Sequence, residues 1–426
     1  MEWLETLDPG TGYLVRKLRY EGYPGMWIPA LLYAPRSADR PLPGVLNANG
    51  HHAGGKAMAY KQARCINLAK RGMLALSTEF IGMGDLRADA DHNRIAHLDL
   101  TGAAGVAVFY LAMKRGLDVL LAHPDSDPAR VAMTGLSGGG WQTAVLSALD
   151  ERIRVIVPVA GHCPVWQRVG CQSDIGDLEQ DPADLCTVAD YDTLTALFAP
   201  RPALLIYNHD DDCCFQTRRT RRSVYAPVRP VYALFGAGDR LRLYDNRDPG
   251  THNYEADNRR QLYRFLDEFF GLRTPDGDLP WEDELYTERE LSVDLPQQQE
   301  TLLSLAQAAA TNRAGNSSIA SGTWSSGMRM PRRGAERTRR SATGSPPVFR
   351  GFRTWISAPM ALRMLSTPTR VGFMPTCSRV RSEPGAMLAP TRKKAAEEIS
   401  AGTSSSRPTS RPPPSRQTVA PWRWTG

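Results

Sequence analysis

Short apolar runs rich in β-branched and aromatic residues recur along the first 270 or so residues of the chain. Gly, Pro, Asn and Asp bound these runs, and such residues mark turns between strands. Strands are predicted at Tyr13–Tyr20, Met26–Tyr33, Gly44–Asn47, Met73–Glu79, Arg130–Thr134, Ile153–Val159, Ala203–Tyr207 and Val231–Phe235. Apolar positions at helical spacing predict helices at Ala59–Arg71, Leu98–Ala122, Gly139–Ala148, Tyr191–Leu197, Arg218–Tyr225 and Asn258–Phe270.

The order of these elements predicts the fold class. The first three runs are joined by short connections such as Glu21–Gly25, as in an antiparallel start. Strands and helices then alternate, which argues for a mostly parallel central sheet with helices on both faces. We therefore expect one α/β domain over residues 10–272.

A long irregular stretch separates the strand that ends near Val159 from the helix that begins near Tyr191. Loops of this length are usually lids or binding elements. The stretch carries apolar and aromatic residues, so we interpret residues 162–190 as a lid-like insert that covers the substrate.

The composition changes after about residue 300. Residues 301–426 hold 20 Lys and Arg but only 4 Asp and Glu, a net charge of +16, which leaves −9 for the first 300 residues. The segment is rich in Ser, Arg, Pro, Gly and Thr and cannot bury enough apolar surface to offset chain entropy. We predict an extension at 273–300 and a disordered, low-complexity basic tail at 301–426. A nucleic-acid-binding tail and a stretch translated in a shifted frame are the alternatives, but the basic and aromatic spacing of a binding module is lacking.

Apolar runs and cysteines indicate the cellular compartment in which the protein works. No apolar run approaches the length of a membrane span, and the first residues lack the features of a signal peptide, so a cytoplasmic location is expected. The seven cysteines follow no disulfide or zinc spacing, and we expect most to be reduced and buried. A strained disulfide between the adjacent Cys213 and Cys214 is the alternative.

The segment Gly135-Leu136-Ser137-Gly138-Gly139 carries the strongest chemical signal. It directly follows a predicted strand and precedes a predicted helix, which is the context of a Gly-x-Ser-x-Gly nucleophile elbow. Such a turn strains the serine backbone and needs neighbours without side chains. The free N–H groups of the following helix then face the reacting centre. The sequence therefore predicts Ser137 as a nucleophile.

A serine nucleophile needs a base and an orienting acid, which in this order of motifs follow as Asp or Glu and then His. His252 lies in a loop before the last predicted helix and is the predicted base, whereas His209 precedes the acids and fits the order poorly. Asp212 is the preferred acid after the strand that ends near Tyr207, with Asp211 as the alternative. A metal site built from His209 and these carboxylates is disfavoured because no partner cluster is evident, so no metal or cofactor is expected.

An oxyanion hole needs two backbone N–H donors aimed at the developing negative charge. Gly138, the residue after the nucleophile, is one predicted donor. The loop Asn47–Lys56 is expected to supply the other, and His51 N–H is the predicted donor within it.

Together these motifs resemble the acetyl xylan esterase-like and dienelactone hydrolase-like branch of the α/β-hydrolase superfamily, over about residues 10–272. The matching segments are Gly50–Lys56, Gly82–Asp85, Gly135–Gly140, Asp211–Asp212 and His252. The resemblance implies an ester-hydrolysing serine triad without metal or organic cofactor, acting on acylated carbohydrates or small esters. Asn49 in the oxyanion turn and Cys213-Cys214 after the acid depart from the family pattern.

The sequence therefore predicts a serine esterase that acts through an acyl-enzyme, with deacetylation of carbohydrates as the expected activity. One alternative is a serine peptidase related to prolyl oligopeptidases, although such enzymes normally carry a large accessory domain that the short stretch before the first strand cannot supply. Another is a catalytically silent relative that binds a ligand, against which the presence of Ser, Asp and His argues. The expected partner is a small ester or acylated sugar, without membrane or nucleic acid.

Overall fold

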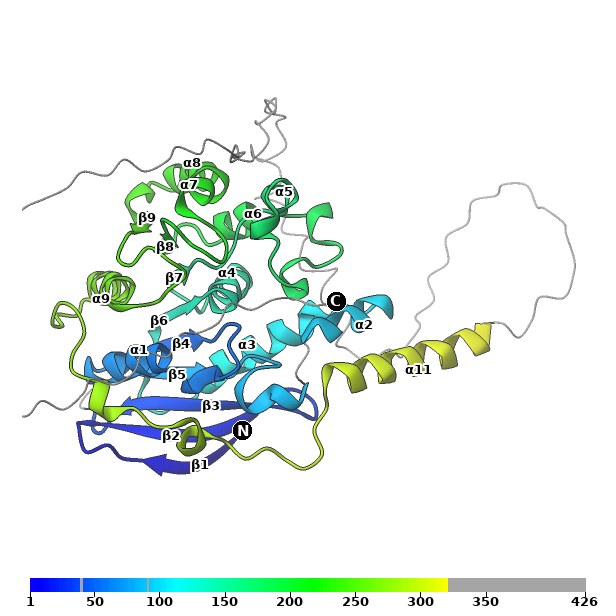
Figure 1. The fold of residues 1–426 in the computed structure, drawn as a ribbon, viewed down its shortest axis with the longest axis horizontal. Coiled ribbons are helices and arrows are strands. Elements are labelled where there is room, and N and C mark those ends of the chain that lie inside the picture. Colours follow the sequence, from blue (N-terminus) through cyan, green and yellow to red (C-terminus); the bar gives the residue numbers. More distant parts are fainter. Residues whose placement is uncertain (39–40, 90–91, 321–426) are drawn as a thin grey trace, which may run out of the picture. The chain divides into compact units, whose positions relative to one another are not determined.

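The computed structural model describes residues 1–38, 41–89 and 92–320 (Figure 1). The chain divides into the units Met1–Cys377 and Ser378–Gly426, and all described residues belong to the first. One nine-stranded sheet has the order β1-β2-β3-β5-β4-β6-β7-β8-β9. Its strands are β1 (Glu2–Leu7), β2 (Tyr13–Tyr23), β3 (Met26–Pro35), β4 (Leu42–Ala48), β5 (Leu74–Thr78), β6 (Ser126–Leu136), β7 (Val155–Val159), β8 (Ala203–Asn208) and β9 (Leu241–Asn246).

The sheet changes from antiparallel to parallel at β5. Strands β1, β2 and β3 pair antiparallel, and β3 pairs antiparallel with β5. From β5 through β4, β6, β7 and β8 to β9 every pairing is parallel. The predicted α/β architecture with a mostly parallel sheet is confirmed. The expectation that Gly44–Asn47 continues the antiparallel start is wrong, because β4 inserts between two parallel neighbours.

Alternation along the strands builds two cores, one on each face of the sheet. In β3, Leu31 and Tyr33 enter one core while Ala30 and Leu32 enter the other, as the two-residue period of a strand requires. Helices α1 (Ala59–Lys70) and α9 (Ala256–Phe270) supply one core. Helices α3 (Val106–Leu121), α4 (Gly138–Leu149), α6 (Tyr191–Ala196) and α8 (Ala226–Leu234) supply the other.

Shorter helices complete the described part of the chain. They are α2 (Ile95–Leu100), α5 (Val165–Gly170), α7 (Thr217–Thr220), α10 (Glu288–Leu291) and a π-helical turn at Arg221–Tyr225. The 3₁₀ turns next to the site are η1 (Gly55–Ala57), η2 (Gly84–Asp89), η3 (His92–Arg94), η4 (Gln172–Asp174), η5 (Leu178–Gln180) and η6 (Leu185–Thr187). The predicted lid-like insert thus consists of α5 and three 3₁₀ turns joined by irregular chain.

The last predicted strand is wrong. Residues Val231–Phe235 belong to α8 and its end, where Val228 and Tyr232 are buried four residues apart on one helix face. A short apolar run fits a buried helix face as well as a strand, which explains the error. The true last strand, β9, lies at the sheet edge, is only partly buried and alternates with polar residues. Edge strand β1 was also missed, and it begins before the predicted domain start at residue 10.

The predicted extension at 273–300 packs along α1 and α9. Leu279 N donates to Asn67 Oδ1 at 2.7 Å, and Tyr286 N donates to Gln62 Oε1 at 3.0 Å. Helix α11 (Leu302–Ala320) follows, and its Leu302 is fully buried. The predicted start of the disordered tail at residue 301 is therefore corrected, because the apolar residues that open α11 complete the core. Residues 321–426 lie outside the described residues.

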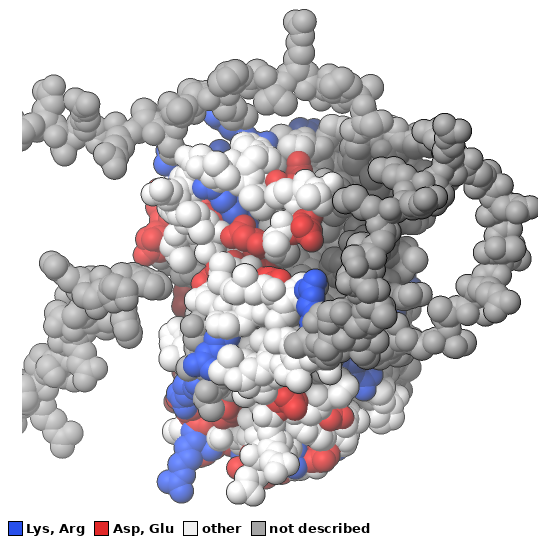
Figure 2. Space-filling view, turned by 90° about the vertical axis from the view of Figure 1, so that its right-hand side faces the viewer, with Lys and Arg blue, Asp and Glu red and all other residues white. Residues whose placement is uncertain are grey.

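Surface charge, helix hydrophobicity and the cysteines add three observations. Acidic and basic side chains are interspersed among other residues on the face drawn in Figure 2. Within the described ranges, no helix is both long and apolar enough to cross a bilayer. Cys213 and Cys214 are free thiols rather than a vicinal disulfide, and Cys377 lies outside the described residues.

Candidate active site

Ser137 sits in the turn between β6 and α4 with φ of 58°, in the left-handed region that side chains rarely adopt. Its N–H donates to Val159 O at 2.9 Å, which fixes the turn against β7. A Cβ atom on Gly135 would come within 2.5 Å of Ala48 O, and one on Gly139 would come closer still. Both glycines are therefore needed for β4 to pass so near the turn. The strained conformation and its glycine neighbours are those that the sequence motif predicted.

His252 lies in the loop between β9 and α9, and its ring faces Asp211. The distances from His252 Nδ1 to the two carboxylate oxygens of Asp211 are both 2.9 Å. Burial of the imidazole opposes its charge, but the hydrogen bond and the negative charge of Asp211 outweigh this and raise the pKa of His252 above its usual 6.5. This contact orients the ring and leaves Nε2 as the nitrogen available for proton transfer.

The preference for Asp212 as the partner of this imidazole is corrected by the geometry. Asp212 is exposed, and its Oδ1 accepts a hydrogen bond from the backbone N–H of His252 at 2.8 Å. That hydrogen bond lowers the pKa of the Asp212 carboxyl. Asp211 is the buried residue because the loop after β8 turns back at this point. Oxygens of Asp211 accept from Cys213 N at 3.1 Å and Cys214 N at 2.9 Å.

Asparagine side chains hold the two loops together. Asn208 Nδ2 donates to Asp211 Oδ2 at 2.8 Å, so the buried carboxylate has donors on both oxygens. Asn253 Nδ2 donates to Asn246 Oδ1 at 3.1 Å, and Asn258 Nδ2 donates to Asn208 Oδ1 at 3.1 Å. These asparagines lie at the ends of β8 and β9 and in the next loop and helix, and sequence reasoning missed them.

The predicted oxyanion turn after β4 is fixed by buried side chains. Gln142 of α4 donates to Asn49 O at 2.7 Å, and Asn49 Nδ2 donates to Thr78 O at 2.7 Å. Lys61 of α1 lies beneath the turn, and its Nζ is 3.4 Å from Gly50 O. The turn is therefore bound to α1, β5 and the helix that follows the nucleophile.

Gly50 lets this turn approach the nucleophile elbow closely. A Cβ on Gly50 would lie 2.6 Å from Leu136 O and 3.0 Å from Gly138 N. In a trans peptide the C=O and the following N–H point in opposite directions, so His51 N–H points away from Lys61. Gly138 N is the first helical N–H after Ser137 and has no partner within its own helix. The assignment of His51 and Gly138 as oxyanion donors stays a prediction.

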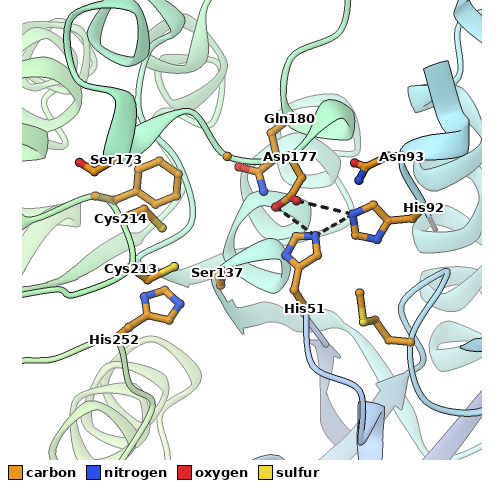
Figure 3. Close-up of a pocket in the computed structure, with 13 residues that line it drawn as sticks. His51, His92, Asn93, Ser137, Ser173, Asp177, Gln180, Cys213, Cys214 and His252 are labelled. Carbon is orange, nitrogen blue, oxygen red and sulfur yellow. Dashed lines mark hydrogen bonds and ion pairs between the residues drawn. The ribbon is translucent and has the colours of Figure 1, made fainter. Parts of the chain in front are cut away.

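The predicted nucleophile, base and oxyanion-turn residues line one pocket (Figure 3). Ser137, His51 and His252 line it, and Cys213 Sγ lies beside the His252 ring. The insert at 162–190 lines the same pocket through Ser173, Gly176, Asp177 and Gln180.

The insert is tied to the nucleophile helix by a buried hydrogen-bond chain. Trp141 Nε1, four residues after Ser137, donates to Tyr191 Oη at 2.7 Å. Tyr191 in turn donates to the backbone oxygen of Gln180 at 2.5 Å. Both rings are fully buried, so this chain connects the helix of the elbow directly to the pocket-facing part of the insert.

Two groups of side chains among the described residues could hold a metal ion. One consists of Cys213, Cys214 and His252, and the other of His51, His92, Asp177 and Glu179. The second group joins the oxyanion turn to η3 and to the insert. Sequence reasoning assigned a role to the backbone N–H of His51 and did not connect the His51 side chain to His92, because the two residues are distant in the chain.

The sheet order and the strand–helix turn that bears Ser137 define an α/β-hydrolase. A structure described as Methylesterase BT1017 has the same fold, with a TM-score of 0.52 and 20% identity over 73% of this chain and 68% of that one. The acetyl xylan esterase from Paenibacillus sp. R4 gives a TM-score of 0.47 and 18% identity over 63% of this chain and 87% of that one.

Two matches in sequence agree with this fold and with ester hydrolysis. Residues 10–177 match the family model for acetyl xylan esterase (AXE1). A Bacillus subtilis (strain 168) protein, YtaP, a hydrolase by name, is 26% identical over 250 residues, which cover 56% of this chain and 82% of that protein. The predicted resemblance to acetyl xylan esterases is confirmed by this match, and the protein is a carboxylic-ester hydrolase with the α/β-hydrolase fold.

Proposed function

We propose that the protein cleaves acyl esters through a triad of Ser137, His252 and Asp211. The observation that carries this proposal is the pair of 2.9 Å contacts between His252 Nδ1 and the Asp211 carboxylate, in a pocket that Ser137 also lines. The raised pKa of His252 suits a base that must hold a proton during the reaction. Asp211 keeps the imidazole in the tautomer with a free Nε2.

The proposed reaction has two halves. Ser137 Oγ attacks the ester carbonyl while His252 Nε2 accepts the hydroxyl proton, and the N–H groups of Gly138 and His51 hold the oxyanion. Collapse of the tetrahedral intermediate expels the alcohol, which takes the proton from His252. A water molecule, deprotonated by His252, then attacks the acyl-serine. The tetrahedral intermediate formed by this attack collapses and releases the carboxylic acid, and His252 returns the proton to Ser137.

We further propose that the substrate is an acylated carbohydrate and that the reaction removes acetyl groups. The match to the acetyl xylan esterase family supports this choice. The lining of the pocket also supports it, because Asn93, Ser173 and Gln180 present amide and hydroxyl groups that suit sugar hydroxyls. The insert at 162–190 would then act as the substrate-covering lid.

Ser137→Ala tests this proposal, with Ser173→Ala as a matched control because both serines line the pocket. A fluorophosphonate probe should label the wild type and Ser173→Ala but not Ser137→Ala. Acetylated xylo-oligosaccharides, short nitrophenyl esters and aminoacyl amides should be compared as substrates. Deacetylation that persists in Ser137→Ala would refute the triad. Faster turnover of the amides than of the esters would refute the substrate class.

A further inference from the structure

Four metal-binding side chains from three separate segments converge on one wall of the pocket. His51 follows β4, His92 begins η3, and Asp177 and Glu179 belong to the insert. One ligand atom from each of the four lies within 4.8 Å of the other three. In Figure 3 the His51 and His92 rings and the Asp177 carboxylate point toward one another, on the opposite side of Ser137 from His252.

Most of the printed separations between these groups are close to the edge length of a metal-centred tetrahedron. Zinc–nitrogen and zinc–oxygen bonds of about 2.0–2.2 Å put neighbouring ligand atoms about 3.3–3.6 Å apart. His51 Nε2 lies 3.1 Å from His92 Nε2, 3.2 Å from Glu179 Oε1 and 3.4 Å from Asp177 Oδ2. His92 Nε2 lies 3.4 Å from Glu179 Oε2 and 3.9 Å from Asp177 Oδ1. One ring nitrogen from each histidine and one oxygen from each carboxylate lie within 4.8 Å of one another, which places four ligand atoms around one candidate position.

Charge balance favours the same interpretation. The Glu179 side chain has no solvent exposure and that of His92 has 5%. A buried carboxylate is costly unless it is paired or coordinates a metal. Two carboxylates and two neutral imidazoles carry a charge of −2, which one divalent cation neutralises. Two imidazoles disfavour Mg²⁺ and Ca²⁺, which prefer oxygen ligands, and favour Zn²⁺ and its first-row neighbours.

We propose that His51, His92, Asp177 and Glu179 bind one Zn²⁺-class ion that fastens the insert to the oxyanion turn. The site is separate from the triad and goes beyond ester hydrolysis, and it replaces the expectation that the protein binds no metal. Two ligands come from the insert and one from the turn that carries the His51 N–H, so an ion here holds the insert closed over Ser137. The Cys213, Cys214 and His252 group is the poorer site, because it offers three ligands rather than four and one of them, His252, is the proposed base of the triad.

Metal binding by the full chain tests this proposal. After dialysis against a chelator, the protein should bind one Zn²⁺ per chain by titration calorimetry, and Co²⁺ should give the visible absorption of a tetrahedral site. Glu179→Gln and Asp177→Asn should each weaken Zn²⁺ binding more than about 100-fold, because even outer-shell changes at metal sites cost 10–100-fold. Asp184→Asn, an exposed carboxylate of the same insert, and Cys213→Ser are the matched controls and should bind as the wild type does.

Stability gives a second measurement. Zn²⁺ at 100 times its dissociation constant should raise the unfolding midpoint of the wild type by about 5 °C or more and protect residues 162–190 from proteolysis. Neither effect should occur in Glu179→Gln, whose circular dichroism reports whether it is folded. No Zn²⁺ binding by the wild type, or binding lost in Cys213→Ser and kept in Glu179→Gln, would overturn the proposal. Fluorophosphonate labelling of the same samples tests the triad independently.

Discussion

Asp211→Asn and Asp212→Asn form a matched pair that tests which carboxylate serves the base. The residues are adjacent, the substitutions are isosteric, and each removes one negative charge. Asp211 contacts the His252 ring, whereas Asp212 contacts only the His252 backbone N–H. A large effect is therefore expected from the first substitution and a small one from the second.

The size of the Asp211→Asn effect follows from the donors around the carboxylate. Asp211 Oδ1 accepts from Cys213 N and Cys214 N, and Oδ2 accepts from Asn208 Nδ2. An amide NH₂ in either orientation would therefore face another donor, at a cost of about 1–3 kcal/mol in stability. With the NH₂ toward His252, Nδ1 becomes the acceptor and the proton moves to Nε2, where it blocks the base. A loss of about 10³–10⁴-fold in kcat is expected, as when a triad aspartate is amidated in a serine protease.

Asp212→Asn keeps an acceptor for the His252 N–H because the amide oxygen replaces the carboxylate oxygen. The residue is exposed, so the lost charge is screened and kcat should change by less than about threefold. Steady-state hydrolysis of a nitrophenyl ester measures both variants. Circular dichroism confirms that they are folded.

The pH dependence of kcat/KM gives a second test of which carboxylate serves the base. The base works only when neutral, so the acidic limb of kcat/KM should have its midpoint above 6.5 in the wild type, because Asp211 raises the pKa of His252 against the effect of burial. The nearby negative charges of Cys213 and Asp212 also raise the pKa of His252, to a smaller extent. The residual activity of Asp211→Asn should lose this limb or show it below 6.5. The charged pair also adds stability that is full below about pH 6.5 and is lost as pH rises through the folded pKa.

A loss of less than tenfold in Asp211→Asn, together with a larger loss in Asp212→Asn, would refute this assignment. Equal and large losses in two folded variants would show that both carboxylates act on the imidazole, and would also contradict it.

Three further substitutions test other parts of the site. Gly50→Ala should lower kcat at least about 100-fold in a folded protein, because the added methyl would displace the oxyanion turn. An unchanged kcat would refute the assignment of this turn to the oxyanion hole. Glu79→Ala should lower the free energy of unfolding by about 3–5 kcal/mol in urea titrations, because it removes a partner of the buried Lys56 ammonium; a loss below 1 kcal/mol would contradict this. Cys213, whose pKa is lowered by the hydrogen bond from the Cys214 thiol, should react with iodoacetamide at a lower pH than an ordinary thiol does and block the pocket. Cys213→Ser should resist this inactivation, and equal inactivation of that variant would place the reactive thiol elsewhere.

Elements of the fold could be predicted from the sequence where a periodic pattern was long or where a motif had strict stereochemistry. Ser137 was predicted because only glycine neighbours allow so tight a turn, and α1 and α9 because their apolar spacing extends over several turns. Val231–Phe235 was misassigned because five apolar residues fit either element. The edge strands β1 and β9 were missed because their partial burial weakens the alternation.

The site was less predictable where side-chain direction within loops decides it. Three consecutive aspartates follow β8, and their sequence does not indicate that Asp211 turns inward toward the N–H groups of Cys213 and Cys214. His92, Asp177 and Glu179 carry no motif, because their proximity to His51 depends on how the insert folds back over the sheet.

The Trp141–Tyr191–Gln180 chain has a consequence for how such enzymes diversify. An insert between β7 and α6 could in principle be exchanged freely among relatives to alter specificity. Here the insert is attached to the nucleophile helix, so deleting it would leave the Tyr191 hydroxyl without its acceptor beside a buried indole, at a cost of about 1–3 kcal/mol. A segment moved between relatives should therefore include Tyr191 and α6. If only the irregular stretch were exchanged, the hydrogen bonds that connect the insert to the nucleophile helix would be lost.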